Sequence, residues 1–89
     1  MYFVYVLFCS DDQLYIGYST NLKDRLRAHE SGSVKSTKHR LPAKIFYYEN
    51  YKNKNDAMAR EVYLKSGGGH REFKRQHQHE LKRLGYKHL

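Results

Sequence analysis

The order of apolar and polar positions predicts a short sheet in the first half of the chain. The segment Tyr2–Phe8 is aromatic, aliphatic and β-branched throughout, as expected of a strand that is covered on both faces. Turn-forming residues follow at 10–12, and a second strand is predicted over Leu14–Tyr18, so that the two form a hairpin. A third strand is predicted over Ile45–Tyr48. We expect these strands to form a small three-stranded antiparallel sheet.

Helical periodicity predicts one helix after the hairpin and another after the third strand. Thr20 or Asn21 can cap the first of these helices, which ends near Glu30. Asn53 or Asn55 begins the second helix, which continues to about residue 65. The buried side of this second helix is expected to consist of Ala57, Met58, Val62 and Leu64.

A run of glycines, Gly67–Gly69, follows the second helix and is expected to end it. The run lacks the Lys-Ser/Thr pair of a phosphate-binding loop. A third, strongly charged helix is predicted over Arg71–Leu84. The expected fold class is therefore α/β in the broad sense, of the α+β type. Its element order is β-β-α-β-α-α, with helices flanking the sheet, in a single domain over residues 1–89.

The net charge and the cysteine content limit which binding partners and which cellular compartment are expected. Lys and Arg number 17 against 9 Asp and Glu, a net charge of +8 that indicates a polyanionic partner. Nucleic acid is the first candidate and an anionic membrane the second. The lone Cys9 cannot form an intramolecular disulfide, which fits a reducing compartment. The apolar run Tyr2–Phe8 is too short to span a bilayer and has no basic leader, so a cytoplasmic protein is expected.

Three polar residues on the predicted helices are candidates for chemistry. Arg25 and His29 lie four positions apart and share a helix face, which can either hold a phosphate or form an ordinary solvated surface. Glu61 lies within the apolar stripe of the second helix, and a carboxylate there needs a partner. That partner is a metal ion, a cation, or a salt-bridge residue at the rim.

Two tyrosines of the hairpin add to this set. Tyr5 and Tyr15 are ten positions apart on adjacent predicted strands, so the short turn should make them near neighbours across the ladder. The register is not fixed by the sequence, so whether they share a face stays open. Interior tyrosines usually belong to the core, although each hydroxyl still requires a hydrogen-bond partner.

In combination, these positions resemble the GIY-YIG nuclease family. The two tyrosine motifs of that family are matched by Phe3-Val4-Tyr5 and Tyr15-Ile16-Gly17. The helix pattern that follows is matched by Asn21-Leu22, Arg25-Leu26 and His29, and the metal-binding glutamate by Glu61. The match covers about residues 1–64, and the tail resembles that of small stand-alone bacterial GIY-YIG proteins of the UPF0213 type.

The resemblance implies a metal-dependent endonuclease that hydrolyses phosphodiester bonds in nucleic acid, with DNA as the first candidate. Tyr15 would be the general base or would orient the attacking water. Tyr5 would position the phosphate or that water, and Arg25 would stabilise charge on the scissile phosphate. His29 would assist proton transfer or hold a phosphate oxygen. Glu61 would ligate one divalent ion, Mg²⁺ or Mn²⁺, and a hard cation of this kind is satisfied by one carboxylate with waters and phosphate oxygens.

Three departures from the family pattern keep other functions open. Phe3 replaces the first glycine of the name motif, and Tyr18 stands where repair-type nucleases often carry a lysine. No asparagine follows Glu61, although many family members use one late in the domain. A catalytically weak or inactive nucleic-acid-binding module is therefore one alternative, and a protein-interaction domain for an acidic partner is another.

A basic segment between the first helix and the third strand is the expected nucleic-acid contact. No acidic residue occurs between Glu30 and Glu49. Phosphate contacts from such a segment make binding salt-dependent and largely indifferent to base sequence. A domain this small normally needs a targeting partner protein to choose its substrates, and the sequence identifies none. The expected nucleic-acid-binding residues are Lys35, Lys38, His39, Arg40 and Lys44.

Overall fold

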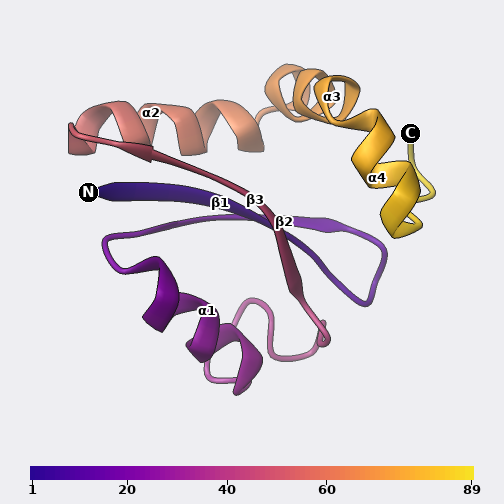
Figure 1. Ribbon diagram of the computed structural model, residues 1–89, viewed down its shortest axis with the longest axis horizontal. Coiled ribbons are helices and arrows are strands. Elements are labelled where there is room, and N and C mark those ends of the chain that lie inside the picture. Colours follow the sequence, from indigo (N-terminus) through magenta and orange to yellow (C-terminus); the bar gives the residue numbers. More distant parts are fainter.

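The computed structural model describes residues 1–89 and contains one three-stranded sheet. Strand β1 spans Tyr2–Phe8, β2 spans Leu14–Ser19 and β3 spans Lys44–Tyr51. The strand order is β2-β1-β3, and both pairings are antiparallel. The most apolar strand is thus the central one, which agrees with its prediction as a strand covered on both faces (Figure 1).

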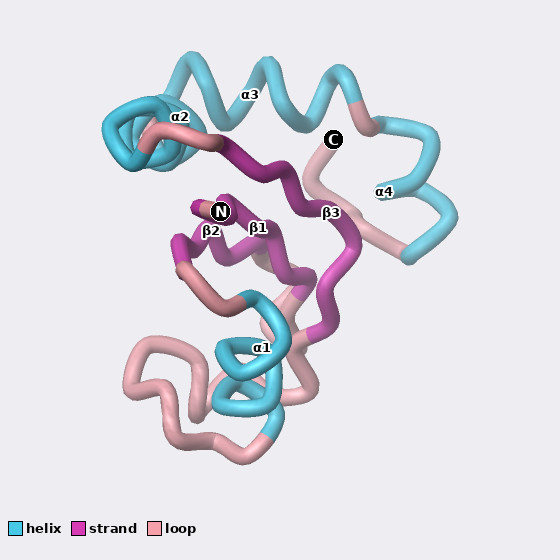
Figure 2. The backbone as a smooth tube through the Cα atoms, turned by 60° about the vertical axis from the view of Figure 1, so that its left-hand side comes forward, coloured by secondary structure: helices cyan, strands magenta, loops and turns pink.

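Four helices cover the two faces of this sheet. Helix α1 (Leu22–Glu30) lies on one side, and α2 (Lys54–Lys65) and α3 (Gly67–Gln76) lie on the other, as Figure 2 shows. The short helix α4 (Gln78–Leu84) continues the chain from the end of α3. None of the four helices has the length and the apolar composition of a membrane-spanning segment.

Alternation along β1 divides the interior into two cores, because successive side chains of a strand point to opposite faces. Val4 and Val6 face α2, α3 and α4, and they pack with Ile16, Leu64 and Phe73 in the larger core. The opposite face of β1 carries the smaller core, which α1 covers with Leu22 and Leu26. That core is built on Tyr5, Leu7, Cys9 and Ala43, and Cys9 is buried there.

The N-cap residues of α1 and α2 are both asparagines. The Asn21 side chain accepts a hydrogen bond from the Asp24 amide, so Asn21 rather than Thr20 begins α1. In the same way, Asn53 accepts from the amide of Asn55 and begins α2. Such caps satisfy amide groups that have no partner within the helix.

The glycine run does not have the structure predicted for it, and neither does the third helix. Helix α2 does end at residue 65, but α3 starts at Gly67 itself, capped by the Ser66 hydroxyl, which accepts from the Gly69 amide. A Cβ at Gly69 would overlap the backbone carbonyl of Tyr63, so this glycine lets the two helices meet at a sharp corner. The expected single helix over 71–84 is interrupted at His77 and forms α3 and α4.

The expected buried side of α2 is only half right. Ala57 and Leu64 are fully buried, but Met58 is 38% exposed and Val62 is 67% exposed. Apolar character alone predicts all four residues to face inward, whereas a helix can present only one stripe to the sheet. The remaining apolar positions of α2 therefore face solvent.

Candidate functional site

The register of the hairpin places the two candidate tyrosines on the same face of the sheet. Tyr5 lies opposite Gly17, and Tyr15 lies opposite Leu7, so the two tyrosines are diagonal neighbours. Their ring centroids are 6.3 Å apart. A Cβ at position 17 would overlap the ring and hydroxyl of Tyr5, so only glycine leaves room for this ring over β2.

A chain of buried hydrogen bonds runs from this tyrosine into the loop after α1. The Tyr5 hydroxyl lies 2.6 Å from Nε2 of His29, and Nδ1 of His29 lies 2.7 Å from Oγ1 of Thr37. The Arg25 Nε donates to the Tyr5 hydroxyl at 3.4 Å. The Tyr5 oxygen accepts from Arg25, and its own hydrogen has Nε2 as an acceptor, so the arrangement that satisfies every group has Tyr5 donating to Nε2 and Nδ1–H donating to Thr37.

Burial keeps both members of the Tyr5–His29 pair neutral. Burial raises the pKa of Tyr5 above its ordinary value, although the hydrogen bond from Arg25 opposes this shift. Burial, and after it the positive charge of Arg25, lowers the pKa of His29. A neutral imidazole has one N–H and one acceptor nitrogen, which is what the assigned arrangement requires.

The site consequently has a buried layer and an accessible layer. Tyr5, His29 and Thr37 have exposed fractions of 0%, 1% and 0%, so none of them reaches solvent. Tyr15 and Arg25 are partly exposed above them, and the Tyr15 hydroxyl accepts a hydrogen bond of 3.2 Å from Ser36. The Tyr15 ring packs edge-on against His29 with centroids 5.2 Å apart. Only the upper layer can touch a ligand in this conformation.

Glu61 lies on α2, which covers the opposite face of the sheet from α1. Burial is the main cause of the raised pKa of Tyr5, and the negative charge of Glu61 adds a smaller contribution. The Glu61 side chain is 15% exposed and forms an ion pair of 3.2 Å with Lys65 one helical turn away. The salt bridge that the sequence left open as one partner of Glu61 is thus present.

The donor set fits only a metal ion that carries much of its own coordination. No group of three or more His, Cys, Asp and Glu side chains is placed to hold a metal. A closed zinc site is therefore excluded by its ligand requirement. A hard divalent cation that keeps several waters and is bound by one carboxylate and substrate phosphates is compatible with Glu61 alone.

The basic segment between α1 and β3 contains both exposed and engaged side chains. Lys35, Lys38, His39 and Lys44 are exposed. Arg40 differs from them, because its Nε donates to the Asp11 carboxylate at 2.7 Å and thereby ties the segment to the hairpin turn. The hydrogen bond from Arg40 lowers the pKa of Asp11.

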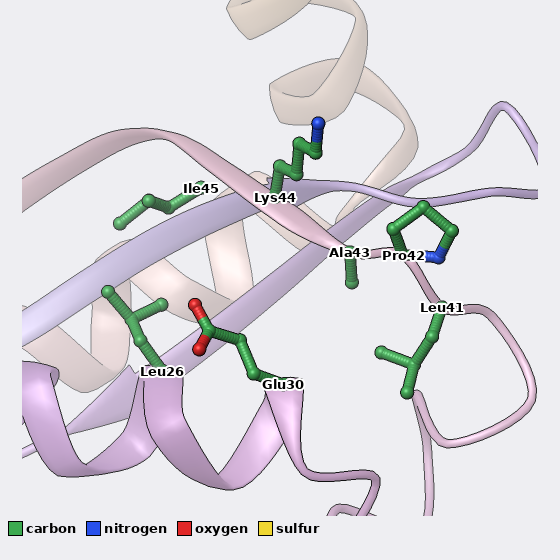
Figure 3. A pocket seen from close by; sticks show the side chains of 7 residues that line it. All are labelled: Leu26, Glu30, Leu41, Pro42, Ala43, Lys44 and Ile45. Atoms are coloured by element: carbon green, nitrogen blue, oxygen red, sulfur yellow. The ribbon is translucent and has the colours of Figure 1, made fainter.

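A separate hollow lies between α1 and the beginning of β3 (Figure 3). It is lined mainly by apolar side chains and includes none of the candidate catalytic residues. Its polar members are Glu30 on α1 and Lys44 on β3, and Figure 3 shows Glu30 extending toward the sheet. The chemistry of this hollow is not that of the tyrosine site. Its lining residues are Leu26, Glu30, Leu41, Pro42, Ala43, Lys44 and Ile45.

Two site residues were missed by the sequence reasoning. Thr37 and Ser36 both lie in the polar loop after α1, where serine, threonine and lysine are unremarkable. Their contacts with His29 and Tyr15 depend on how the loop folds back over α1, and no local periodicity encodes that path. The one indication of such contacts is general: if His29 is buried, each of its ring nitrogens needs a hydrogen-bond partner.

Comparison with known proteins places this chain in a family. The family model of the GIY-YIG catalytic domain matches residues 1–76. A UPF0213 protein of Clostridium perfringens is 44% identical over 66 residues, which is 73% of this chain and 71% of that protein. The UPF0213 protein YsiG of Lactococcus lactis is 51% identical over 65 residues, 72% of this chain and 62% of that protein. A solution structure of a UPF0213 protein from Bacillus halodurans is 29% identical, with a TM-score of 0.48, and covers 99% of this chain and 89% of that one.

Proposed function

We propose that this chain, which belongs to the GIY-YIG catalytic-domain family, is a metal-dependent endonuclease that hydrolyses phosphodiester bonds in nucleic acid, with DNA as the first substrate to test. The observation that carries the proposal is the placement of Tyr15 and Arg25 directly above the buried Tyr5–His29 pair. These are positions that the family motifs assign to chemistry, and they converge from three separate elements.

The accessible layer provides the groups that contact the phosphate and the attacking water. Arg25 presents a guanidinium to the phosphoryl oxygens, where negative charge accumulates in the transition state. Tyr15 orients the attacking water through its hydroxyl, or in its phenolate form accepts the proton of that water, and Ser36 donates a hydrogen bond to its oxygen. Glu61 binds a divalent ion, Mg²⁺ or Mn²⁺, which supplies charge stabilisation at the phosphate oxygens when bound.

The buried layer holds the accessible one in place. Because Tyr5 and His29 are covered, direct contact with phosphate, which the family resemblance had suggested for both, is not part of this proposal. Tyr5 instead accepts from Arg25 and thereby fixes the direction of the guanidinium. His29 fixes Tyr5 and supports the ring of Tyr15.

The decisive experiment is a cleavage assay with branched, single-stranded and duplex DNA in the presence and absence of Mg²⁺. Glu61→Gln should abolish cleavage and leave most DNA binding intact, because it removes the ion-binding charge and preserves the shape of the side chain. Glu30→Gln, which removes an exposed carboxylate from α1, is the matched control and should cut at the wild-type rate. Cleavage by Glu61→Gln at the wild-type rate would show that the metal role is wrong.

The same assay separates the two alternative functions. A protein that binds DNA but never cuts it, with either ion, is a binding module on the nuclease fold. A protein that neither cuts DNA nor binds it at low salt fits the protein-interaction alternative. Neutralising Lys35 and Lys38 together should weaken DNA binding and flatten its dependence on salt, because each phosphate contact releases counterions. Unchanged affinity would show that this loop is not the contact surface.

A further inference from the structure

The outward side of α3 carries a continuous cationic stripe. Lys74 and Arg75 lie three and four positions after Arg71, and Gln78 at the start of α4 lies four positions after Lys74 and three after Arg75, so the four are neighbours on one side of the helical path. Phe73, which lies on the opposite side of the helix, is only 1% exposed and packs in the larger core. The stripe therefore faces away from the sheet.

The last residues of the chain lie beside this stripe, and together they line a hollow. After α4 the chain returns toward α3, so that its last residues lie near that helix in both views (Figures 1 and 2). Lys74 lies over the Tyr86 ring, with Nζ 5.8 Å from the ring centroid, and this contact fixes one wall. The lining residues are Arg71, Lys74, Arg75, Gln78, His88 and Leu89.

Most of the positive charge in this hollow is not neutralised within the protein. Arg75 is held by Glu72 through two hydrogen bonds, so that pair contributes little net charge. Arg71 and Lys74 have no carboxylate partner, and no acidic side chain lines the hollow. The lining also offers the Gln78 amide and the His88 imidazole as hydrogen-bond donors or acceptors.

The position of the hollow separates it from the candidate active site. Helix α3 covers the face of the sheet to which Val4 and Val6 point, whereas Tyr5, Tyr15 and Arg25 lie on the face that α1 covers. Figure 2 shows α3 and α1 on opposite sides of the strands. A nucleic acid bound at the tyrosines therefore does not occupy the α3 hollow with the same stretch of backbone.

We infer that this hollow is a second phosphate-binding surface, which holds the backbone of a DNA duplex on the side of the sheet opposite the tyrosines. The inference rests on nucleic acid being the partner under the proposed function. An interface for an acidic protein would be expected to have an apolar or aromatic centre, and Leu89 is the only apolar residue that lines the hollow. Phosphate contacts need only cations and polar donors, which is what the lining offers.

The test compares two double variants that each lose two positive charges. Arg71→Gln with Lys74→Gln removes the free cations of the hollow, and Lys82→Gln with Lys87→Gln removes two exposed cations outside it. All proteins carry Glu61→Gln, so that the DNA stays intact, and circular dichroism checks their folding. The probe is a fluorescein-labelled DNA duplex of about 24 base pairs, titrated at several salt concentrations between about 50 and 200 mM.

The hollow variant should bind the duplex more weakly, and its log–log salt slope should fall by about 2, one unit for each lost phosphate contact. The control variant should keep the slope of the protein with an intact hollow. Equal slopes in the two variants, or no duplex binding at the lowest salt, would overturn the inference. Displacement of the duplex by poly-glutamate at equal charge concentration would also overturn it, in favour of an acidic protein partner.

This measurement does not depend on the proposed chemistry. If the wild-type protein fails to cut DNA but the hollow variant still shows the lower slope, the nuclease proposal falls and the second surface stands. If the wild-type protein cuts DNA and the slopes are equal, the reverse holds.

Discussion

Thr37→Val tests the buried layer of the site with the smallest possible change of shape. Valine replaces the threonine hydroxyl with a methyl group of similar size, so no sizeable cavity forms. The change removes the partner of His29 Nδ1, which lies 2.7 Å from the hydroxyl. Every buried side-chain nitrogen and oxygen is hydrogen-bonded in the wild-type protein, so the variant introduces an unsatisfied buried donor.

The magnitude follows from the burial of both partners. Thr37 is 0% and His29 is 1% exposed, so water cannot replace the lost bond. A buried donor that loses its partner costs about 1–3 kcal/mol. At about 4–8 °C per kcal/mol for a domain of this size, a loss near 2 kcal/mol lowers Tm by about 8–16 °C. The assays are urea unfolding and thermal unfolding followed by circular dichroism.

Two controls and an NMR signature make the result specific. Thr37→Ser keeps the hydroxyl and should retain most of the stability, and Thr20→Val makes the same exchange at an exposed position and should change little. Long-range proton–nitrogen NMR of His29 should show the proton on Nδ1 in the wild-type protein and a shifted tautomer balance in Thr37→Val. A stability change below about 0.5 kcal/mol with an unchanged tautomer would refute the assigned chain of hydrogen bonds.

The remaining predictions concern glycine positions and pH. Gly17→Ala should destabilise the fold by about 1–3 kcal/mol through overlap with the Tyr5 ring, and equal stability in urea unfolding would contradict the close approach. Gly69→Ala should unfold at lower urea than wild type, whereas Gly68→Ala, whose Cβ meets open space in a helix, should gain about 0.5–1 kcal/mol; the reverse order would contradict the corner geometry. The pKa of His29 is lowered by burial, so its stabilising contribution is complete above about pH 6.5 and is lost as pH falls through the lowered value. An NMR titration of His29 with a midpoint at or above about 6.5 would count against that burial.

Most helices and strands could be predicted from the sequence because each depends on a strong local pattern of residues. The apolar strand β1, the hairpin and the asparagine caps each depend on a few neighbouring residues. The predicted helix boundary was wrong at Gly67–Gly69, where a glycine is required by tertiary packing. Gly69 is tolerated in a helix because the Tyr63 carbonyl lies against it, and propensity alone favours a break there.

The candidate site was accessible only in part for the same reason. Spacing brought Arg25 and His29 to one face of α1, and the shared face of Tyr5 and Tyr15 needed the register that the structure supplies. The division into a buried and an accessible layer was not predictable. It depends on Thr37 and on the fold of the loop, which lies over His29.

The central position of β1 in the sheet has a consequence for folding during synthesis on the ribosome. Its outer partner β3 begins at Lys44 and ends at Tyr51, so one edge of β1 stays open until those residues have left the exit tunnel. Until then the most apolar strand of the chain is an unprotected edge, to which another nascent chain can pair. The rate of translation therefore determines how long the β1–β2 hairpin exists before β3 pairs with it. Slow synthesis between residues 20 and 51 would favour aggregation.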